Sequence, residues 1–432
     1  MQPTLNRRDF MVAGGLAGGF LLSGMASASG TGNRRPPNIV LIVSDDQGWP
    51  DFGFMGHEVI RTPRLDRLAR DSAVFPNGYV PCSLCRASLA TILTGLYANQ
   101  HHICCNDPPR GTERSRMHPF MRMAPAMPRL LRPSNFSSLQ TGKFWEGHFS
   151  NAGFTHGQTT NTDRHISRQN PSIGRTGMQP IINFIDQNRE NPFFVWYAPL
   201  MPHKPHNPPE RFLRTYRNND RDINIAKYFA MCEWFDETCG QLLDHLDRRQ
   251  LTDNTMVLFI VDNGWVQGTA ANPQHLRSPF GAPRGKRSPY DGGVRTPVLV
   301  KWPGHTRAGR YNDLVSSIDL APTVLTACGV DVPEQMHGVD LMRAASGMGR
   351  LNRNAVFGEI YTHDCSVLGQ PQMDVRFRWC RSGDWKLILP TEGNPELYNI
   401  ARDPHERMNR AGQEGNRVTQ LRNLINEWWN IG

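Results

Sequence analysis

Two polar pairs, each directly after an apolar run, give the first chemical signal in this sequence. Asp45 and Asp46 follow one run, and Asp262 and Asn263 follow another. Ligands in open α/β sheets gather at the carboxyl ends of strands, and adjacent buried carboxylates are costly unless a cation neutralises them. An oxygen-only donor set suits Ca²⁺ or Mg²⁺. One aspartate at a strand end also fits a turn or a helix cap, so the prediction depends on the two pairs together.

A second signal is the stretch 82–95, which contains two cysteines and ends in Thr-Gly. Cys85 lies three residues before Ser88. A cysteine close to cations can act as a nucleophile. Cys82 and Cys85 have the spacing of a redox pair, but the rest of a thioredoxin-like context is missing. Taken alone, without the other motifs, a structural cysteine is the favoured interpretation.

This stretch resembles the signature of the formylglycine-dependent sulfatases, which is Cys-x-(Pro/Ala)-Ser-Arg, four residues and Thr-Gly. In that family the cysteine is oxidised to an aldehyde, formylglycine, whose hydrate attacks the sulfur of a sulfate ester. The resemblance implies an alkaline phosphatase-like fold. It also implies one Ca²⁺ per chain, with the ligands Asp45, Asp46, Asp262, Asn263 and the formylglycine made from Cys85.

The resemblance extends to residues that would bind sulfate and transfer protons. A Gly-Lys pair ends at Lys143, and His148 follows it at a wider spacing than the family's two residues. A Pro-His pair ends at His203, and Lys286 precedes an Asp-Gly-Gly-x-Arg-x-Pro segment. These matches imply that the two lysines bind the sulfate and that one histidine protonates the leaving alcohol.

One position departs from the pattern, because Leu89 stands where the family has arginine. We predict that Arg86, the residue after Cys85, supplies the missing charge. A second frame that starts at Cys82 places Arg86 correctly, but it needs three extra residues before Thr-Gly. Three residues would turn the buried face of a following helix by most of a turn, so we favour Cys85.

The resemblance implies a sulfatase that hydrolyses a sulfate ester, with a sulfated carbohydrate as the expected substrate and a formylglycine-generating enzyme as the maturation partner. A phosphoesterase of the same superfamily is the first alternative. Cys85 argues against it, since those enzymes use serine or threonine as nucleophile. An inactive homologue that binds sulfated glycans is the second alternative, and Leu89 keeps it open.

The elements that must position these residues alternate along the chain. Residues 38–43, 192–197 and 256–261 are apolar runs typical of strands buried on both faces. Apolar residues at helical spacing predict helices over 226–246 and 182–188. This alternation predicts an α/β fold with a large, mostly parallel sheet sandwiched by helices.

The pattern changes near residue 345, which predicts a catalytic domain over 29–345 and a C-terminal subdomain over 346–432. The subdomain is expected to be a small antiparallel sheet plus a helix, with strands near 354–360, 375–380 and 385–389 and a helix near 418–429. Two long irregular loops, 102–135 and 264–290, are expected to carry substrate specificity.

Composition excludes some classes of protein. The 432 residues are 38% hydrophobic, which allows a core, and no stretch after the N-terminus is long and apolar enough to span a bilayer. The net charge of +9 comes from scattered basic residues, so we expect no nucleic-acid partner. The nine cysteines show no spacing typical of a disulfide framework or a zinc site.

Residues 1–28 have the pattern of a twin-arginine signal peptide. Arg7 and Arg8 precede a glycine-rich apolar run, and Ala26-Ser27-Ala28 offers a cleavage site. The segment predicts a bacterial protein that folds in the cytoplasm before export to the periplasm or the cell exterior.

Overall fold

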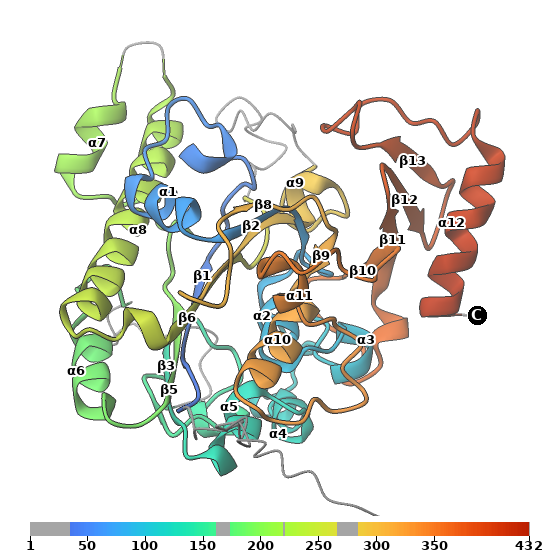
Figure 1. Ribbon diagram of the computed structural model, residues 1–432. Coiled ribbons are helices and arrows are strands. Elements are labelled where there is room, and N and C mark those ends of the chain that lie inside the picture. Colours follow the sequence, from blue (N-terminus) through green and yellow to red (C-terminus); the bar gives the residue numbers. More distant parts are fainter. Residues whose placement is uncertain (1–34, 161–172, 219–220, 266–283, 432) are drawn as a thin grey trace, which may run out of the picture. The chain divides into compact units, whose positions relative to one another are not determined.

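A nine-stranded mixed sheet is the central element of the computed structural model, which describes residues 35–160, 173–218, 221–265 and 284–431 (Figure 1). The strand order is β4-β3-β5-β1-β6-β7-β2-β8, with β9 paired to β2. Only β7 runs antiparallel to its neighbours β6 and β2, so the expected mostly parallel sheet is confirmed. The strands are β1 (Asn38–Ser44), β2 (Ala73–Tyr79), β3 (Ser137–Gly142), β4 (His156–Gly157), β5 (Phe193–Ala198), β6 (Thr255–Val261), β7 (Arg295–Lys301), β8 (Gly309–Arg310) and β9 (Val315–Ser316).

Alternate residues of the central strand face two separate hydrophobic cores. Ile39, Leu41 and Val43 belong to one core, whereas Val40 and Ile42 belong to the other. Side chains of a strand point alternately to opposite faces, so a strand buried on both sides must be apolar throughout, as the continuous run in this sequence is.

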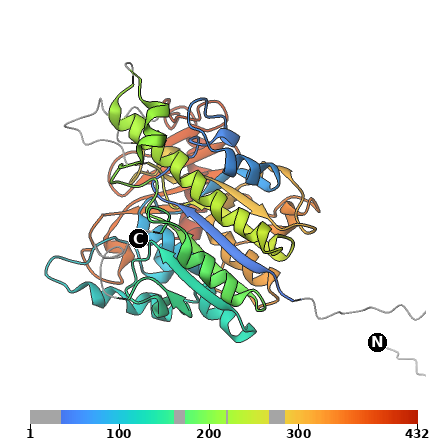
Figure 2. The same cartoon turned by 90° about the vertical axis from the view of Figure 1, so that its left-hand side faces the viewer.

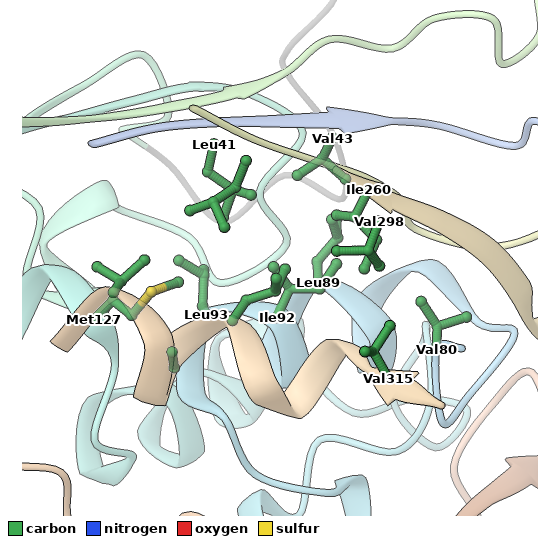
Figure 3. Close-up of a cluster of buried hydrophobic side chains, with 14 of the residues drawn as sticks. Leu41, Val43, Val80, Leu89, Ile92, Leu93, Met127, Ile260, Val298 and Val315 are labelled. Carbon is green, nitrogen blue, oxygen red and sulfur yellow. The ribbon is translucent and has the colours of Figure 1, made fainter. Parts of the chain in front are cut away.

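Helices cover both faces of the sheet. On one face, α2 (Cys85–Thr94) and α10 (Leu320–Ala327) pack on the strands, and Figure 3 shows Leu89 of α2 near Ile260 and Val298 of the sheet. On the other face lie α1 (Pro63–Arg70), α6 (Gln179–Asn188) and the long α8 (Ile223–Arg248) (Figure 2). The helices predicted at 182–188 and 226–246 are therefore confirmed as α6 and α8.

The stretch 102–135 is more ordered than predicted. Short helices occupy much of it, because Pro119 and Pro128 stand in the first turn of α4 and α5, where a proline loses no helical hydrogen bond. The remaining α-helices are α3 (Ala98–His101), α4 (Pro119–Met123), α5 (Met127–Leu131), α7 (Glu210–Tyr216), α9 (Asp291–Val294) and α11 (Met342–Ala345). Most of the second predicted loop, 264–290, and the predicted signal segment lie outside the described residues.

A separate four-stranded antiparallel sheet follows, as expected for the C-terminal part (Figure 1). Its strands are β10 (Ala355–Tyr361), β11 (Val375–Ser382), β12 (Trp385–Pro390) and β13 (Glu396–Asn399), and α12 (Gly415–Trp428) packs on β11 and β12. The sequence did not predict β13, which has only four residues and is polar at both ends. Among the described helices, none combines the length and apolarity that crossing a membrane would need.

Candidate active site

The carboxyl ends of four neighbouring strands bring the predicted residues together. β1 and β6 pair in parallel with Ser44 opposite Val261, so the residues that follow them lie side by side. On the other side of β1, β5 leads toward His203, and β3 beyond it leads directly into Lys143. One edge of the sheet thus collects side chains from segments more than 200 residues apart.

Four carboxylate and amide oxygens at this edge are buried and accept no hydrogen bond. They are Asp45 Oδ2, Asp46 Oδ2, Asp262 Oδ2 and Asn263 Oδ1, one from each of the predicted aspartate and asparagine ligands. One oxygen of each aspartate and the sulfur of Cys85 lie within 4.8 Å of one another. Buried polar atoms are nearly always satisfied, so this oxygen-rich group fits a hard cation such as Ca²⁺.

Two buried lysines balance part of the negative charge. Lys143 Nζ lies 2.5 Å from Asp45 Oδ1 and 3.6 Å from Asp262 Oδ2, and Lys286 pairs with Asp46 Oδ1. Burial alone would lower the lysine pKa values, but the neighbouring carboxylates outweigh it and raise both. The two side chains are therefore cationic at neutral pH.

The surroundings shift the pKa values of Asp46 and Asp262 in opposite directions. Burial opposes ionisation of Asp46, yet the charges of Lys286, His203 and Lys143 lower its pKa below the ordinary value. At Asp262, burial and then the negative charge of Asp45 raise the pKa well above the ordinary value. The lysines thus leave excess negative charge around Asp262, which a divalent cation would neutralise.

Cys85 is the first residue of α2 and lies inside the cluster. Its sulfur is 2.8 Å from Lys286 Nζ and 3.9 Å from Asp46 Oδ1. Ser88, one turn later, donates a hydrogen bond to the Asp262 carbonyl and so ties the helix to the end of β6. Burial raises the pKa of the Cys85 thiol to about 12 although Lys143 and Lys286 lower it. Unmodified, this thiol is therefore a poor nucleophile at neutral pH.

Cys82 lies elsewhere. It belongs to a different buried cluster, with Tyr361 and Cys365 among its members. The structure therefore places Cys85, which the spacing to Thr-Gly favoured, beside the aspartates, and it places Cys82 in another cluster.

The structure corrects the role expected of Arg86. Its guanidinium is buried and makes two hydrogen bonds with Glu146, at 2.7 and 2.8 Å, and it also donates to the Cys105 carbonyl. Successive helical residues point about 100° apart, so the side chain after Cys85 faces away from the cluster. Leu89 does not contribute there either, because it packs in the core under the sheet (Figure 3). The cation that contacts Cys85 is Lys286.

The structure also corrects His148. This histidine is exposed, caps the short 3-10 helix Phe149–Ala152 through Ser150 and packs against Phe149. Two residues after Lys143, where the resemblance would place the histidine, this chain has Trp145. The centre of the Trp145 ring lies 6.0 Å from Lys143 Nζ. Among the described residues, His203 is the predicted histidine at the site, with Nε2 3.5 Å from Asp46 Oδ2 and a side chain 22% exposed.

Two positioning residues, Glu146 and Asn106, were missed from the sequence, whereas Gly142 belongs to the Gly-Lys pair already singled out. Gly142 has φ 72° and a Cβ there would lie 2.0 Å from the Ala198 carbonyl, so only glycine allows the turn into Lys143. Glu146 holds Arg86, and Asn106 accepts a hydrogen bond from the Arg86 backbone. The spacing to these partners is long and irregular, so no sequence pattern could have identified them.

Comparison with known proteins agrees with this geometry. The sulfatase family model matches residues 37–330, and the model for the C-terminal part of N-sulphoglucosamine sulphohydrolase matches residues 284–428. Human N-acetylgalactosamine-6-sulfatase is 29% identical, over 87% of this chain and 82% of its own. The Bacteroides thetaiotaomicron N-acetylgalactosamine-6-O-sulfatase is 23% identical, over 91% and 93%. The crystal structure of Ps i-CgsB in complex with k-i-k-neocarrahexaose has a TM-score of 0.75 at 25% identity, and covers 92% of this chain and 94% of that one.

Proposed function

From the premise that this chain belongs to the formylglycine-dependent sulfatase family of the alkaline phosphatase-like superfamily, we propose that it removes sulfate from a sulfated carbohydrate with a formylglycine made from Cys85 and one Ca²⁺. The chain is a sulfuric ester hydrolase. Its relatives include sulfatases named for N-acetylgalactosamine 6-sulfate, and one solved relative holds a neocarrahexaose. These names support a carbohydrate as the carrier of the sulfate.

The observation that carries the mechanism is the group of four buried oxygens that accept no hydrogen bond, beside Cys85 and two lysines. Asp45, Asp46, Asp262 and Asn263 would hold the cation. Ca²⁺, when bound, would neutralise these ligands and lower the pKa of a coordinated hydroxyl. Formylglycine at position 85 would supply, as its hydrate, that hydroxyl as the nucleophile.

The remaining residues act on the charge of the substrate. Lys286 already contacts the sulfur of Cys85, so its ammonium is placed to meet the sulfate oxygens when the ester approaches that atom. Lys143, which pairs with Asp45, would add a second positive charge. Both lysines stabilise negative charge that grows toward the transition state.

His203 is the residue we assign to protonation of the leaving oxygen. Its ring lies beside Asp46 and is partly exposed, so it can exchange a proton with solvent after each turnover. Nδ1 faces the Lys204 carbonyl at 2.6 Å, which leaves Nε2 on the side of the site.

The test is mass spectrometry of the protein co-produced with a formylglycine-generating enzyme, followed by assays on sulfate and phosphate esters. We expect the aldehyde at position 85, and hydrolysis of sulfated N-acetylgalactosamine or a sulfated galactan oligosaccharide. Cys85→Ala should be inactive, and the matched variant Cys82→Ala should keep most of the activity.

Two results would contradict the proposal. Conversion of Cys82 with Cys85 intact would move the nucleophile to the other frame. Faster turnover of phosphate than of sulfate esters, with both cysteines unmodified, would favour a phosphoesterase.

A further inference from the structure

Outside the active site, three cysteines and an aspartate form a second group of buried ligand atoms. Cys104, Cys105, Cys365 and Asp374 are all buried, and one ligand atom from each lies within 4.8 Å of all the others. Cys104 and Cys105 follow α3, whereas Cys365 follows β10 and Asp374 precedes β11. The group therefore joins two parts of the chain that are 260 residues apart.

Backbone pairing brings the two segments together. The Asn106 amide donates to the His363 carbonyl at 2.9 Å, and the Cys365 amide donates to the Asp107 carbonyl at 2.9 Å. The cysteines of both segments thereby face the same buried space.

Asp374 has an oxygen without a partner at this group. Its Oδ1 accepts hydrogen bonds from Thr362 Oγ1, the Ser366 amide and Ser366 Oγ, at 3.1, 2.8 and 2.6 Å. Its Oδ2 is buried and accepts none. A buried carboxylate oxygen is costly to leave unsatisfied, and three hydrogen bonds on the other oxygen fix the direction in which it points.

We propose that Cys104, Cys105, Cys365 and Asp374 bind one structural Zn²⁺. Zinc takes four ligands in a tetrahedron, and thiolates with a carboxylate are a ligand set that it accepts. With Zn–S bonds of about 2.3 Å, two sulfurs on one zinc lie about 3.8 Å apart. The Cys104 and Cys105 sulfurs are 3.6 Å apart, close to that separation without a bond between them.

A disulfide explains these observations less well than zinc does. One disulfide would join two of the three sulfurs, and it would leave the third thiol and Asp374 Oδ2 unsatisfied. Zinc engages all four groups at once. It also places a divalent cation among thiolates that would otherwise repel one another. The Arg86 guanidinium, which donates to the Cys105 carbonyl, adds a further positive charge near these thiolates.

The site would be structural rather than catalytic. Four protein ligands leave no open position for water, and the group lies in the buried cluster that also contains Cys82, not in the acidic group around Cys85. Zinc would fix the chain after α3 against the segment that connects β10 and β11.

The experiment measures metal content and cobalt spectra of the whole protein. We expect about one zinc per chain after purification without chelators. Replacement with Co²⁺ should give a sulfur-to-metal charge-transfer band and the strong visible bands of a tetrahedral site. Cys365→Ser should lose both the zinc and the bands, Asp374→Asn should bind cobalt at least tenfold more weakly, and Cys328→Ala, a buried cysteine outside the group, should behave as wild type.

These readouts are independent of the proposed sulfatase mechanism. Cys85→Ala should abolish turnover and keep the charge-transfer band, so failure at one site is distinguishable from failure at the other. Wild-type protein alone suffices if a cysteine variant fails to fold. Absence of both zinc and a cobalt band in reduced wild-type protein would overturn the proposal. A disulfide among these cysteines, seen as two thiols that resist alkylation after denaturation without reductant, would overturn it too.

Discussion

The position of Lys286 is the strongest single indication of the chemistry at the active site. Its ammonium contacts both the Cys85 sulfur and Asp46, so a single side chain connects the nucleophile position with the cation ligands. The family arginine is replaced by Leu89, which lies in the core. Lys286 and Lys143 are thus the cations that the described part of the chain provides at Cys85 and the aspartates.

We predict that Lys286→Ala lowers kcat/KM by about 2–4 kcal/mol, roughly 30- to 1000-fold, because a stabiliser of transition-state charge is lost. Steady-state kinetics of formylglycine-containing enzyme would measure it. Lys301→Ala is the matched control, since Lys301 pairs with the exposed Asp71 and lies outside the group of residues around Cys85. Unchanged kinetics in the Lys286 variant would show that other groups bind the sulfate.

The elements that hold the site depend on buried polar contacts. Ser88 ties α2 to the end of β6, and Arg86 ties the start of α2 to Glu146 in the segment after β3. Arg86 therefore positions Cys85 relative to Lys143 without facing the site itself.

Glu146→Gln should lower the free energy of unfolding by about 3–5 kcal/mol, because Arg86 would remain buried without its counter-charge. Glu237→Gln is the control: its pair with Arg211 is also bidentate but is exposed, so the loss should stay under about 1 kcal/mol. Denaturant unfolding of the two variants compares them. Equal losses would mean that the Arg86 pair contributes no more than a surface pair.

A second contact between elements predicts a pH dependence. Glu359 of β10 is fully buried and accepts hydrogen bonds from the Ala98 and Asn99 amides at the start of α3. Burial raises its pKa from 4.5 to about 8, although these hydrogen bonds lower it. Between these values the folded state binds the proton more tightly than the unfolded state, so its contribution to stability falls as the pH rises.

Glu359→Gln should remove this contribution to the pH dependence, because glutamine keeps an acceptor and cannot ionise. The variant should match wild type near pH 4.5 and become more stable than it above pH 8, by at most about 5 kcal/mol. Thermal melts across this range, with exposed Glu427→Gln as control, would measure the difference. A constant difference at all pH values would show that Glu359 is ionised in the fold throughout.

Within the compact unit that begins at Pro36, buried ion pairs connect the large sheet's side of the molecule with the C-terminal sheet. Lys386 of β12 lies 2.8 Å from Asp291 at the start of α9 and 3.0 Å from Glu406. The segment that carries Lys286 therefore rests on the C-terminal sheet. The expected boundary near residue 345 separates two sheets, but this ion network links them.

We predict that Lys386→Met lowers stability by about 3–5 kcal/mol and also lowers kcat/KM, because two carboxylates would be left buried without their cation next to the Lys286 segment. Unfolding should remain a single transition by both fluorescence and circular dichroism. Arg422→Met, an exposed position on α12, should change neither quantity. Two separate transitions in the wild type would show that the C-terminal sheet unfolds independently.

The sequence by itself determined the main strands, the long helices and most of the residues at the active site. Burial on both faces requires continuous apolar runs, and ligands at the ends of parallel strands must follow those runs directly. Asp45, Asp46, Asp262 and Asn263 directly follow two such runs, whereas the roles predicted for Cys85, Lys143 and Lys286 came from the resemblance to the sulfatase signature.

Only the tertiary structure decided the direction of side chains and the pairing of distant segments. It turned Arg86 toward Glu146, left His148 at the surface and brought Cys365 to Cys104 and Cys105. Contacts of this kind depend on how elements pack across tens or hundreds of residues, and spacing along the chain carries no information about them. For that reason the proposed zinc site could not be identified from the spacing of its cysteines along the chain.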